Sequence, residues 1–274
     1  MIKPGEIQKI ANRLGIRDTQ IEKDYVIGWI LKGISNNQFL KNKLLFKGGT
    51  ALRKIYFPDY RLSEDLDFTY YGSDYKVEDI RNNFKSLIEW VKNEVRINLE
   101  IQEETEYQTG NYNFYFSYIG PLGGVGANKS VKVDIANDEK LCNDPIEKIV
   151  HNEYSDLSEE FKILSYTLEE IVAEKMRSLM QRTMSRDLYD IWYMFEAENK
   201  AIEDFIFNFQ EKTVFKKLDP KQVTKSVLAK EATFKGQWET SLSQQIKNIP
   251  DFDQVWRSLG SIGRNTISLL IHKF

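Results

Sequence analysis

The chain of 274 residues is long enough for one large domain or two modest ones, and 41% of the residues are hydrophobic, which is sufficient for a packed core. Its 38 basic and 41 acidic residues nearly balance, which excludes a protein that holds nucleic acid through a uniformly positive surface. The single cysteine, Cys142, excludes an internal disulfide framework and a cysteine-rich zinc site, and is typical of a reducing compartment.

The first predicted elements are two helices within residues 5–39, separated near residues 15–19, because apolar residues recur there at helical spacing. The most apolar stretch, residues 25–34, is interrupted by Lys32 and Gly33 and is shorter than the roughly 20 residues that span a bilayer. The first residues lack the pattern of a secretory signal. We therefore expect a cytoplasmic protein with no membrane partner.

A strand, a glycine bend and a helix are predicted next. The strand covers residues 43–46, the bend is Gly48-Gly49-Thr50 with Thr50 as a candidate N-cap, and the helix covers residues 51–56. The patterns that follow predict a mixed sheet flanked by helices, and so an α+β fold. The further strands are expected at residues 66–71, 96–103, 112–119 and 130–135, and a long helix at residues 77–95.

The pattern changes from strands to helices after Pro145, which indicates a second domain. We expect a core with N-terminal helices over residues 1–155, and a helical C-terminal lobe over residues 156–274 that closes the cleft of the core. The helices of this lobe are expected at residues 168–180, 187–198, 202–209 and 252–259. His151 and His272 lie outside every motif, and no Ser/His/Asp or Cys/His arrangement is present.

Two aspartates two residues apart stand at the beginning of the second predicted strand. Side chains alternate between faces along a strand, so Asp65 and Asp67 point the same way, with Cα atoms roughly 6 to 7 Å apart. If the strand that carries Asp134 lies beside them, three carboxylates converge. Two carboxylates about 5 Å apart repel by roughly 3 kcal/mol at an effective dielectric of 20, so the cluster needs a cation. Oxygen ligands without His or Cys favour one or two Mg²⁺ ions.

The Gly48-Gly49-Thr50 bend is the second candidate feature. Bare backbone amides at a helix N-terminus attract a phosphate, and glycine lets the ligand approach closely. Each feature alone has a simpler explanation, since many strand-to-helix connections need glycine and an Asp-x-Asp pair can be a solvated strand end. Together, the bend and the aspartates Asp65 and Asp67 favour a site for a nucleoside triphosphate (NTP) and Mg²⁺.

At these motifs the chain resembles the AbiEii/AbiGii toxin group of nucleotidyltransferases, over about residues 20–195. The resemblance implies a DNA polymerase beta-like core, transfer of a nucleotide from an NTP, and a cognate antitoxin protein. Some members of the group modify tRNA ends and others phosphorylate, so the expected acceptor is an RNA, tRNA among them, or a protein hydroxyl. The segments that carry the resemblance are Glu22–Tyr25, Phe46–Leu52, Arg61–Phe68, Val133–Ile135, Glu169–Lys175 and Arg186–Ile191.

The predicted site residues fall into three sets. Metal ligands are Asp65, Asp67 and Asp134. Catalytic residues are Asp65, Asp67, Asp134, Lys175 and Asp190. Nucleotide-binding residues are Lys47, Gly48, Gly49, Thr50, Arg61, Ser63, Lys175 and Asp187.

Lys175 lies on an otherwise apolar face of its predicted helix, so its ammonium needs a compensating environment. The alternatives are a nucleotide phosphate, a carboxylate of Asp187 or Asp190, or an extended side chain that reaches solvent. Ser185 is a candidate N-cap, and Asp187 at the positive end of that helix then has a structural explanation, whereas Asp190 has none. Two further acids of this segment, Glu170 and Glu174, are expected at the surface.

Two other functions remain open for the same motifs. A kinase would pass the terminal phosphate of the NTP to its acceptor, and a non-catalytic binding module would keep only the fold. Residues 200–247 contain nine lysines and six acids, with Lys217, Lys221 and Lys225 at four-residue spacing. These lysines indicate either a solvated helix face or a contact with an RNA backbone.

Overall fold

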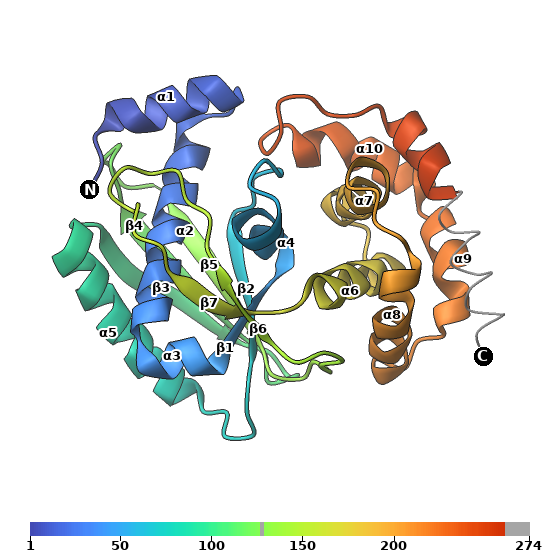
Figure 1. Cartoon of the computed structure of the whole chain (residues 1–274), viewed down its shortest axis with the longest axis horizontal. Coiled ribbons are helices and arrows are strands. Elements are labelled where there is room, and N and C mark those ends of the chain that lie inside the picture. Colours follow the sequence, from blue (N-terminus) through green and yellow to red (C-terminus); the bar gives the residue numbers. More distant parts are fainter. Residues whose placement is uncertain (127–128, 261–274) are drawn as a thin grey trace. The chain divides into compact units, whose positions relative to one another are not determined.

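The computed structural model describes residues 1–126 and 129–260, which divide into two compact units (Figure 1). Unit 1 comprises residues 1–139 and 145–166, and unit 2 comprises residues 140–144 and those from 167 onward. The boundary expected between 155 and 156 thus falls within unit 1, and His272 lies outside the described residues. No helix among the described residues is long and apolar enough to cross a membrane.

A mixed seven-stranded sheet forms the centre of unit 1, in the order β3-β4-β5-β2-β1-β7-β6. The pairs β2–β5 and β1–β7 are parallel, and the other neighbours are antiparallel. The expected α+β fold with a mixed sheet is confirmed. The strands are β1 (Leu44–Lys47), β2 (Asp65–Tyr70), β3 (Asn98–Glu106), β4 (Tyr112–Ile119), β5 (Ser130–Ala136), β6 (Ile146–Ile149) and β7 (Lys162–Ser165).

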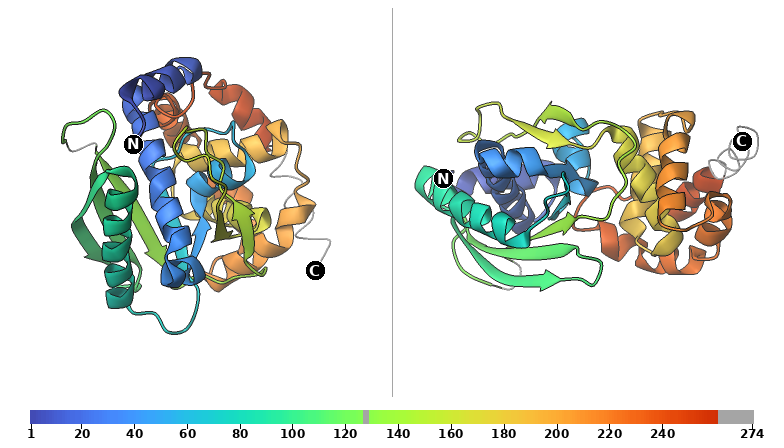
Figure 2. Two further views of the ribbon diagram at one scale, coloured as in Figure 1. Left: turned by 60° about the vertical axis from the view of Figure 1, so that its left-hand side comes forward. Right: turned by 90° about the horizontal axis from the view of Figure 1, so that it is seen from below.

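The two long helices of unit 1, α2 and α5, pack side by side against one face of the sheet (Figure 2). Phe84 of α5 meets the rings of Phe114 and Phe116 on β4 edge-on, with ring centroids 5.0 and 5.1 Å away. The helices approach closely because a Cβ at Gly33 would lie 2.7 Å from Leu87. The helices of unit 1 are α1 (Pro4–Leu14), α2 (Asp18–Asn36), α3 (Gln38–Lys43), α4 (Gly48–Ala51), the π-helix η1 (Leu52–Tyr56) and α5 (Val77–Val95).

Unit 2 is helical and has an aromatic core. Trp238 packs edge-on against Phe252 with ring centroids 5.5 Å apart, and its indole N–H donates to the carbonyl oxygen of Pro250 at 2.8 Å. The sequence does not predict α9, which has only 6 residues, or α10, whose apolar residues show no clear helical periodicity. The helices are α6 (Leu168–Gln181), α7 (Ser185–Trp192), η2 (Tyr193–Ala197), α8 (Glu203–Phe215), η3 (Pro220–Gln222), α9 (Val223–Leu228), α10 (Glu231–Leu242) and a last helix whose described part is 252–260.

A buried ion pair between α6 and α8 corrects the expectation for the acids of α6. Glu170 is 1% exposed and contacts the Nζ of Lys212, which is 0% exposed in its side chain. The other carboxylate oxygen of Glu170 accepts from the backbone N–H groups of Cys142 and Asn143. Glu174, which is half-buried, lies 3.4 Å from the same lysine. The surface expectation is wrong because Lys212 of α8 faces these acids.

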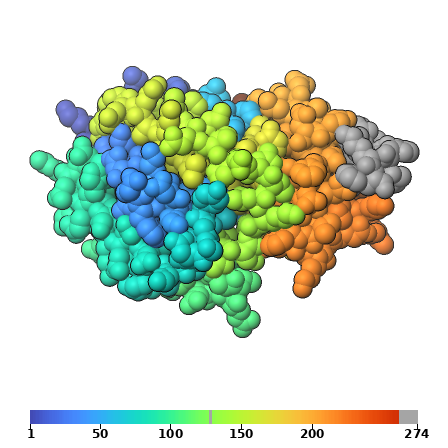
Figure 3. Space-filling view, turned by 60° about the horizontal axis from the view of Figure 1, so that its bottom comes forward, coloured from blue at the N-terminus to red at the C-terminus, as the bar shows by residue number. Residues whose placement is uncertain are grey.

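The lysines of residues 200–247 do not form one helix face. Lys217, Lys221 and Lys225 are exposed, but they lie respectively after α8, in η3 and in α9. Lys217 moreover has the left-handed φ of 59°, so the chain changes direction there. The helical spacing in the sequence is therefore misleading, because the three lysines do not belong to one helix. Figure 3 shows the surface of the segment that contains α8 and α9 in orange.

The single cysteine offers a test of the packing around Glu170. Burial raises the pKa of the Cys142 thiol to about 11, and the negative charge of Glu170 adds to this effect. Because only the thiolate reacts, alkylation at pH 8 is expected to be roughly 100-fold slower than for an exposed cysteine. Mass spectrometry of iodoacetamide-treated protein should show a rate that rises with pH up to about 11. Rapid modification at pH 8 would contradict this environment.

Candidate active site

The glycine bend lies directly against one of the predicted metal ligands. Strands β1 and β2 are antiparallel, which places Lys47 at the end of β1 opposite Asp67 near the beginning of β2. Gly48 follows with φ +79°, and a Cβ there would lie 2.1 Å from Oδ2 of Asp67. Only glycine allows the main chain to approach the carboxylate this closely in this conformation.

The three acids lie on one face of two neighbouring strands. In the parallel pairing of β2 with β5, Asp67 is the Cα partner of Asp134. Leu66 and Phe68, on the other face, are completely buried, whereas Asp65, Asp67 and Asp134 are half-buried. Within the described part of the chain, no group of three or more His, Cys, Asp and Glu side chains is arranged to hold a metal ion. Asp67 and Asp134 are neighbours across the two strands, and the carboxylate oxygens of all three acids are of the type that Mg²⁺ prefers.

Lys132 is a residue of this site that the sequence analysis does not single out. It is the Cα partner of Asp65, and its Nζ lies 2.8 Å from the carboxylate of Asp134. Burial lowers the pKa of Lys132, but the hydrogen bond and charge of Asp134 and the charge of Asp65 outweigh this, so the pKa is raised. The available signal was the alternation of β5, which puts Lys132 and Asp134 on the same face.

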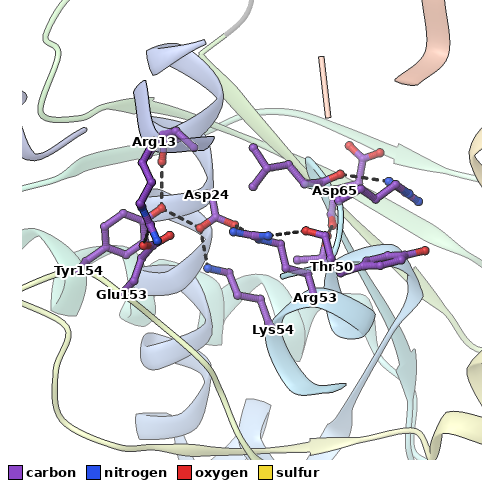
Figure 4. A network of polar contacts seen from close by, with 12 residues as sticks. Arg13, Asp24, Thr50, Arg53, Lys54, Asp65, Glu153 and Tyr154 are labelled. Carbon is purple, nitrogen blue, oxygen red and sulfur yellow. Dashed lines mark hydrogen bonds and ion pairs between the residues drawn. The ribbon is translucent and has the colours of Figure 1, made fainter. Parts of the chain in front are cut away.

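Thr50 positions a metal-ligand candidate instead of capping a helix. Helix α4 begins at Gly48 with Lys47 as its N-cap, so the prediction of Thr50 as N-cap is wrong. Its hydroxyl donates to the backbone carbonyl oxygen of Asp65 (Figure 4). The helix begins earlier than expected because Gly48 and Gly49 form its first turn. Thr50 therefore links α4 to the first residue of β2.

The predicted residues Arg61 and Ser63 lie beside the second glycine of the bend. A Cβ at Gly49 would lie 3.0 Å from the hydroxyl oxygen of Ser63 and 3.1 Å from Nη2 of Arg61. Arg61 is only 4% exposed, and its guanidinium lies 5.5 Å from the ring centre of Tyr60. The structure thus gathers the bend, the loop before β2 and the acids in one region of unit 1.

Lys47 lies at the same end of β1 and is also buried. Its ammonium lies 5.4 Å from the ring centre of Tyr166, an arrangement that favours a cation over the ring face. The Tyr166 hydroxyl is 2.7 Å from Oγ1 of Thr69 on β2, which fixes the ring. The packing of Tyr166 therefore holds Lys47 near the bend.

The remaining predicted residues form a buried charge cluster in unit 2. The Nζ of Lys175 lies 2.6 Å from Asp190 and 3.2 Å from Asp187, and Arg182 contacts Asp187 at 2.8 Å. Among the alternatives for the Lys175 ammonium, the structure shows the carboxylates. Ser185 does not cap α7, because Met184 is the N-cap and the Ser185 hydroxyl donates to the carbonyl oxygen of Phe234 at 3.2 Å.

The contact between Gly48 and Asp67 leads to a graded prediction. Gly48→Ala is expected to cost about 1 to 2 kcal/mol in backbone strain and to displace Asp67, which should weaken Mn²⁺ binding tenfold to a hundredfold. Gly49→Ala should have a smaller effect, because its neighbours are the movable side chains of Ser63 and Arg61. Gly5→Ala, with nothing within 4 Å of its Cβ, is the control. Calorimetric titration with Mn²⁺ measures the affinity of each variant, which should be lowest for Gly48→Ala and highest for Gly5→Ala. Equal affinities for all three variants would contradict the prediction.

Comparison with known proteins adds to this geometry. The sequence model of the family described as "Nucleotidyl transferase AbiEii toxin, Type IV TA system" matches residues 29–258. No curated protein matches the sequence. The structure is similar to that of MenT4, a nucleotidyltransferase toxin from Mycobacterium tuberculosis, with a TM-score of 0.69 and 17% identity over 99% of this chain and 90% of that one. It is also similar to JHP933 from Helicobacter pylori, with a TM-score of 0.56 and 17% identity over 94% of this chain and 96% of that one. At these identities the likeness shows a shared fold.

Proposed function

The chain belongs to the AbiEii family of nucleotidyl transferase toxins of type IV toxin–antitoxin systems, and on this basis we propose that it transfers a nucleotide from an NTP to a hydroxyl of an RNA, with Mg²⁺ as cofactor. A toxin of such a system implies a cognate antitoxin. Membership of this family of nucleotidyl transferases favours nucleotide transfer over the two other functions, which are a kinase reaction and non-catalytic binding. We further propose tRNA as one candidate acceptor, with a protein hydroxyl as the alternative.

The observation that carries this proposal is the contact of the glycine bend with the acids. Gly48 lies against the Asp67 carboxylate, and Asp67 lies beside Asp134 in the sheet. In the proposed site, the backbone amides of Gly48 and Gly49 face the NTP phosphates, next to the side chains of Arg61 and Ser63. Asp65 and Asp67 would hold Mg²⁺, and the bound ion would neutralise the negative charge of the phosphates. Phosphoryl chemistry requires mainly such positioning and charge compensation, without a covalent nucleophile.

The neighbouring side chains have supporting roles in this proposal. Asp134 orients the attacking hydroxyl of the acceptor and receives its proton. The hydroxyl oxygen bonds to the α-phosphorus of the NTP, the bond from that phosphorus to the α,β-bridging oxygen breaks, and pyrophosphate leaves. Arg61 and Ser63, beside Gly49, bind phosphate oxygens together with Lys47. Thr50 keeps Asp65 in place through its hydrogen bond to the Asp65 backbone.

We also assign nucleotide contacts to Lys175, Asp187 and Asp190. The support is their burial as a charged cluster, with Lys175 on the otherwise apolar face of α6 and the two aspartates on α7, because buried groups of charges are frequent at functional sites. If Lys175 only stabilises unit 2, Lys175→Met should lower the melting temperature without a specific rise in the KM for the NTP. A role with the nucleotide predicts that KM rises in protein that remains folded at the assay temperature.

The decisive experiment follows the label of the NTP. Purified protein is incubated with Mg²⁺ and each NTP, labelled at either the α- or the γ-phosphate, together with total cellular RNA or protein. Nucleotide transfer leaves the α-label on the acceptor, whereas the kinase alternative leaves only the γ-label. Transfer of the γ-label alone would contradict the proposed reaction. Absence of any transfer, with no calorimetric binding of the Mg–NTP complex, would support the binding module.

A further inference from the structure

Lys132 stands among the acids of the proposed metal site. It lies on β5, two residues before Asp134, and its Cα partner on β2 is Asp65. Its Nζ is 2.8 Å from Oδ1 and 2.8 Å from Oδ2 of Asp134, so one ammonium engages both carboxylate oxygens. Both side chains are 30% exposed, so water only partly screens the pair. The third carboxylate of the cluster is therefore already compensated by a cation of the protein itself.

This pairing limits how many metal ions the acids can hold. A two-metal site needs shared carboxylates that keep two ions roughly 3.5 to 4 Å apart. Asp134 can bind a second ion only if the Lys132 ammonium moves away from the Asp134 carboxylate. Otherwise the ammonium and the divalent ion would repel each other at close range. Among the described residues, no three acidic, histidine or cysteine side chains are grouped around a common metal position. With Asp134 engaged by Lys132, the acids are better suited to one ion than to a pair.

From the proposed function, on which this inference rests, we infer that Lys132 takes the place of a second metal ion. Asp65 and Asp67 hold a single divalent cation, and the Lys132 ammonium compensates and orients Asp134. The charges agree with this assignment, since the Lys132 ammonium already compensates one of the three carboxylates that divalent cations would otherwise have to balance. Lys132 is accordingly a positioning residue that keeps Asp134 directed at the acceptor hydroxyl.

The test counts bound Mn²⁺ by electron paramagnetic resonance, which requires no turnover. Protein is titrated with Mn²⁺ alone and then with NTP analogues that carry a methylene bridge between the α- and β-phosphates. Wild type is expected to bind one ion with an uncoupled signal. Lys132→Met and Lys132→Gln are expected to bind two ions with the spin-coupled signal of a close pair, because Asp134 becomes available. Lys132→Arg, which keeps the charge, should retain one ion.

Two controls make the count specific. Lys43→Met removes a lysine that contacts Asp74 at 2.7 Å, outside the acid cluster, and should leave one ion. Adding Asp134→Asn to Lys132→Met should return the count from two ions to one. Circular dichroism verifies that each variant is folded, and Lys132→Gln replaces Lys132→Met if the latter is not.

Each other outcome has a defined meaning. A coupled pair in the wild type, or a single ion in both neutral variants, overturns the role of Lys132. Wild type that binds no Mn²⁺ with any analogue, or an ion whose binding survives Asp65→Asn and Asp67→Asn, overturns the metal assignment of the proposed function instead. The two failures are therefore distinguishable.

Discussion

Replacing Asp67 with Asn is expected to reduce the transfer of labelled nucleotide by about 1,000-fold or more. Asp67 contacts the glycine bend and lies next to Asp134, so its carboxylate serves the proposed metal and defines where the phosphates lie. The neutral amide has nearly the same shape, so the circular dichroism spectrum and the melting temperature should change little. Transfer of α-labelled nucleotide to RNA measures the effect.

A matched variant separates this effect from a general loss of acidic charge. Asp59→Asn makes the same chemical change at an exposed position of unit 1, outside the site, and should retain wild-type transfer. Wild-type activity in Asp67→Asn would remove Asp67 from the reaction. A similar loss in both variants would show that the assay reports overall charge.

Replacing Asp24 with Asn is expected to lower the free energy of unfolding by about 3 to 5 kcal/mol. Asp24 is buried on α2 and accepts hydrogen bonds of 2.7 Å from both Lys54 and Tyr154, with Arg53 3.7 Å away (Figure 4). Burial raises the pKa of Asp24, but the charges and hydrogen bonds of these partners outweigh this and hold it below its usual value. Asparagine leaves the buried Lys54 ammonium without its counter-charge, and this causes the loss.

The exposed pair of Asp74 and Lys43 provides the control, because its contact distance is also 2.7 Å. Asp74→Asn should leave the urea denaturation midpoint almost unchanged, since solvent screens the pair. The depressed pKa of Asp24 means that its stabilisation is present above the ordinary value of 3.8 and is lost as the pH falls through the folded-state value. The difference between wild type and Asp24→Asn should therefore narrow in acid. Equal midpoints for both variants at neutral pH would show that the buried pair contributes nothing.

The Asp24 network also explains why the segment Glu22–Tyr25 accompanies the active-site motifs. On one turn of α2, Glu22 accepts from the backbone N–H of Leu122 and pairs with Lys129, whereas Lys23 pairs with Glu64, the residue before Asp65. Asp24 holds Lys54, in the π-helix that continues from the glycine bend. This turn therefore contacts three segments, which are the loop before β5, the residue before β2 and the π-helix after the glycine bend.

The sequence by itself determined the elements that carry the site. Strand-like runs of residues predicted β4 and β5, and helical periodicity predicted α5 with its observed bounds. The spacing of Asp65 and Asp67 predicted that both side chains point the same way. These features depend on the local geometry of strands and helices, which recurs every two or 3.6 residues. Local patterns also revealed the glycine bend, because φ above zero favours glycine.

Only the tertiary structure decided which charges meet. Lys132 and Asp134 share a strand, but the contact of Glu170 with Lys212 and of Asp24 with Lys54 joins residues far apart in the chain. Strands β6 and β7, four residues each, likewise became recognisable only through pairing with their neighbours. Ion pairing and sheet addition depend on distances that packing creates, and composition or periodicity does not specify them. The sequence therefore identified the acids and the bend, and the fold determined how their charge is compensated.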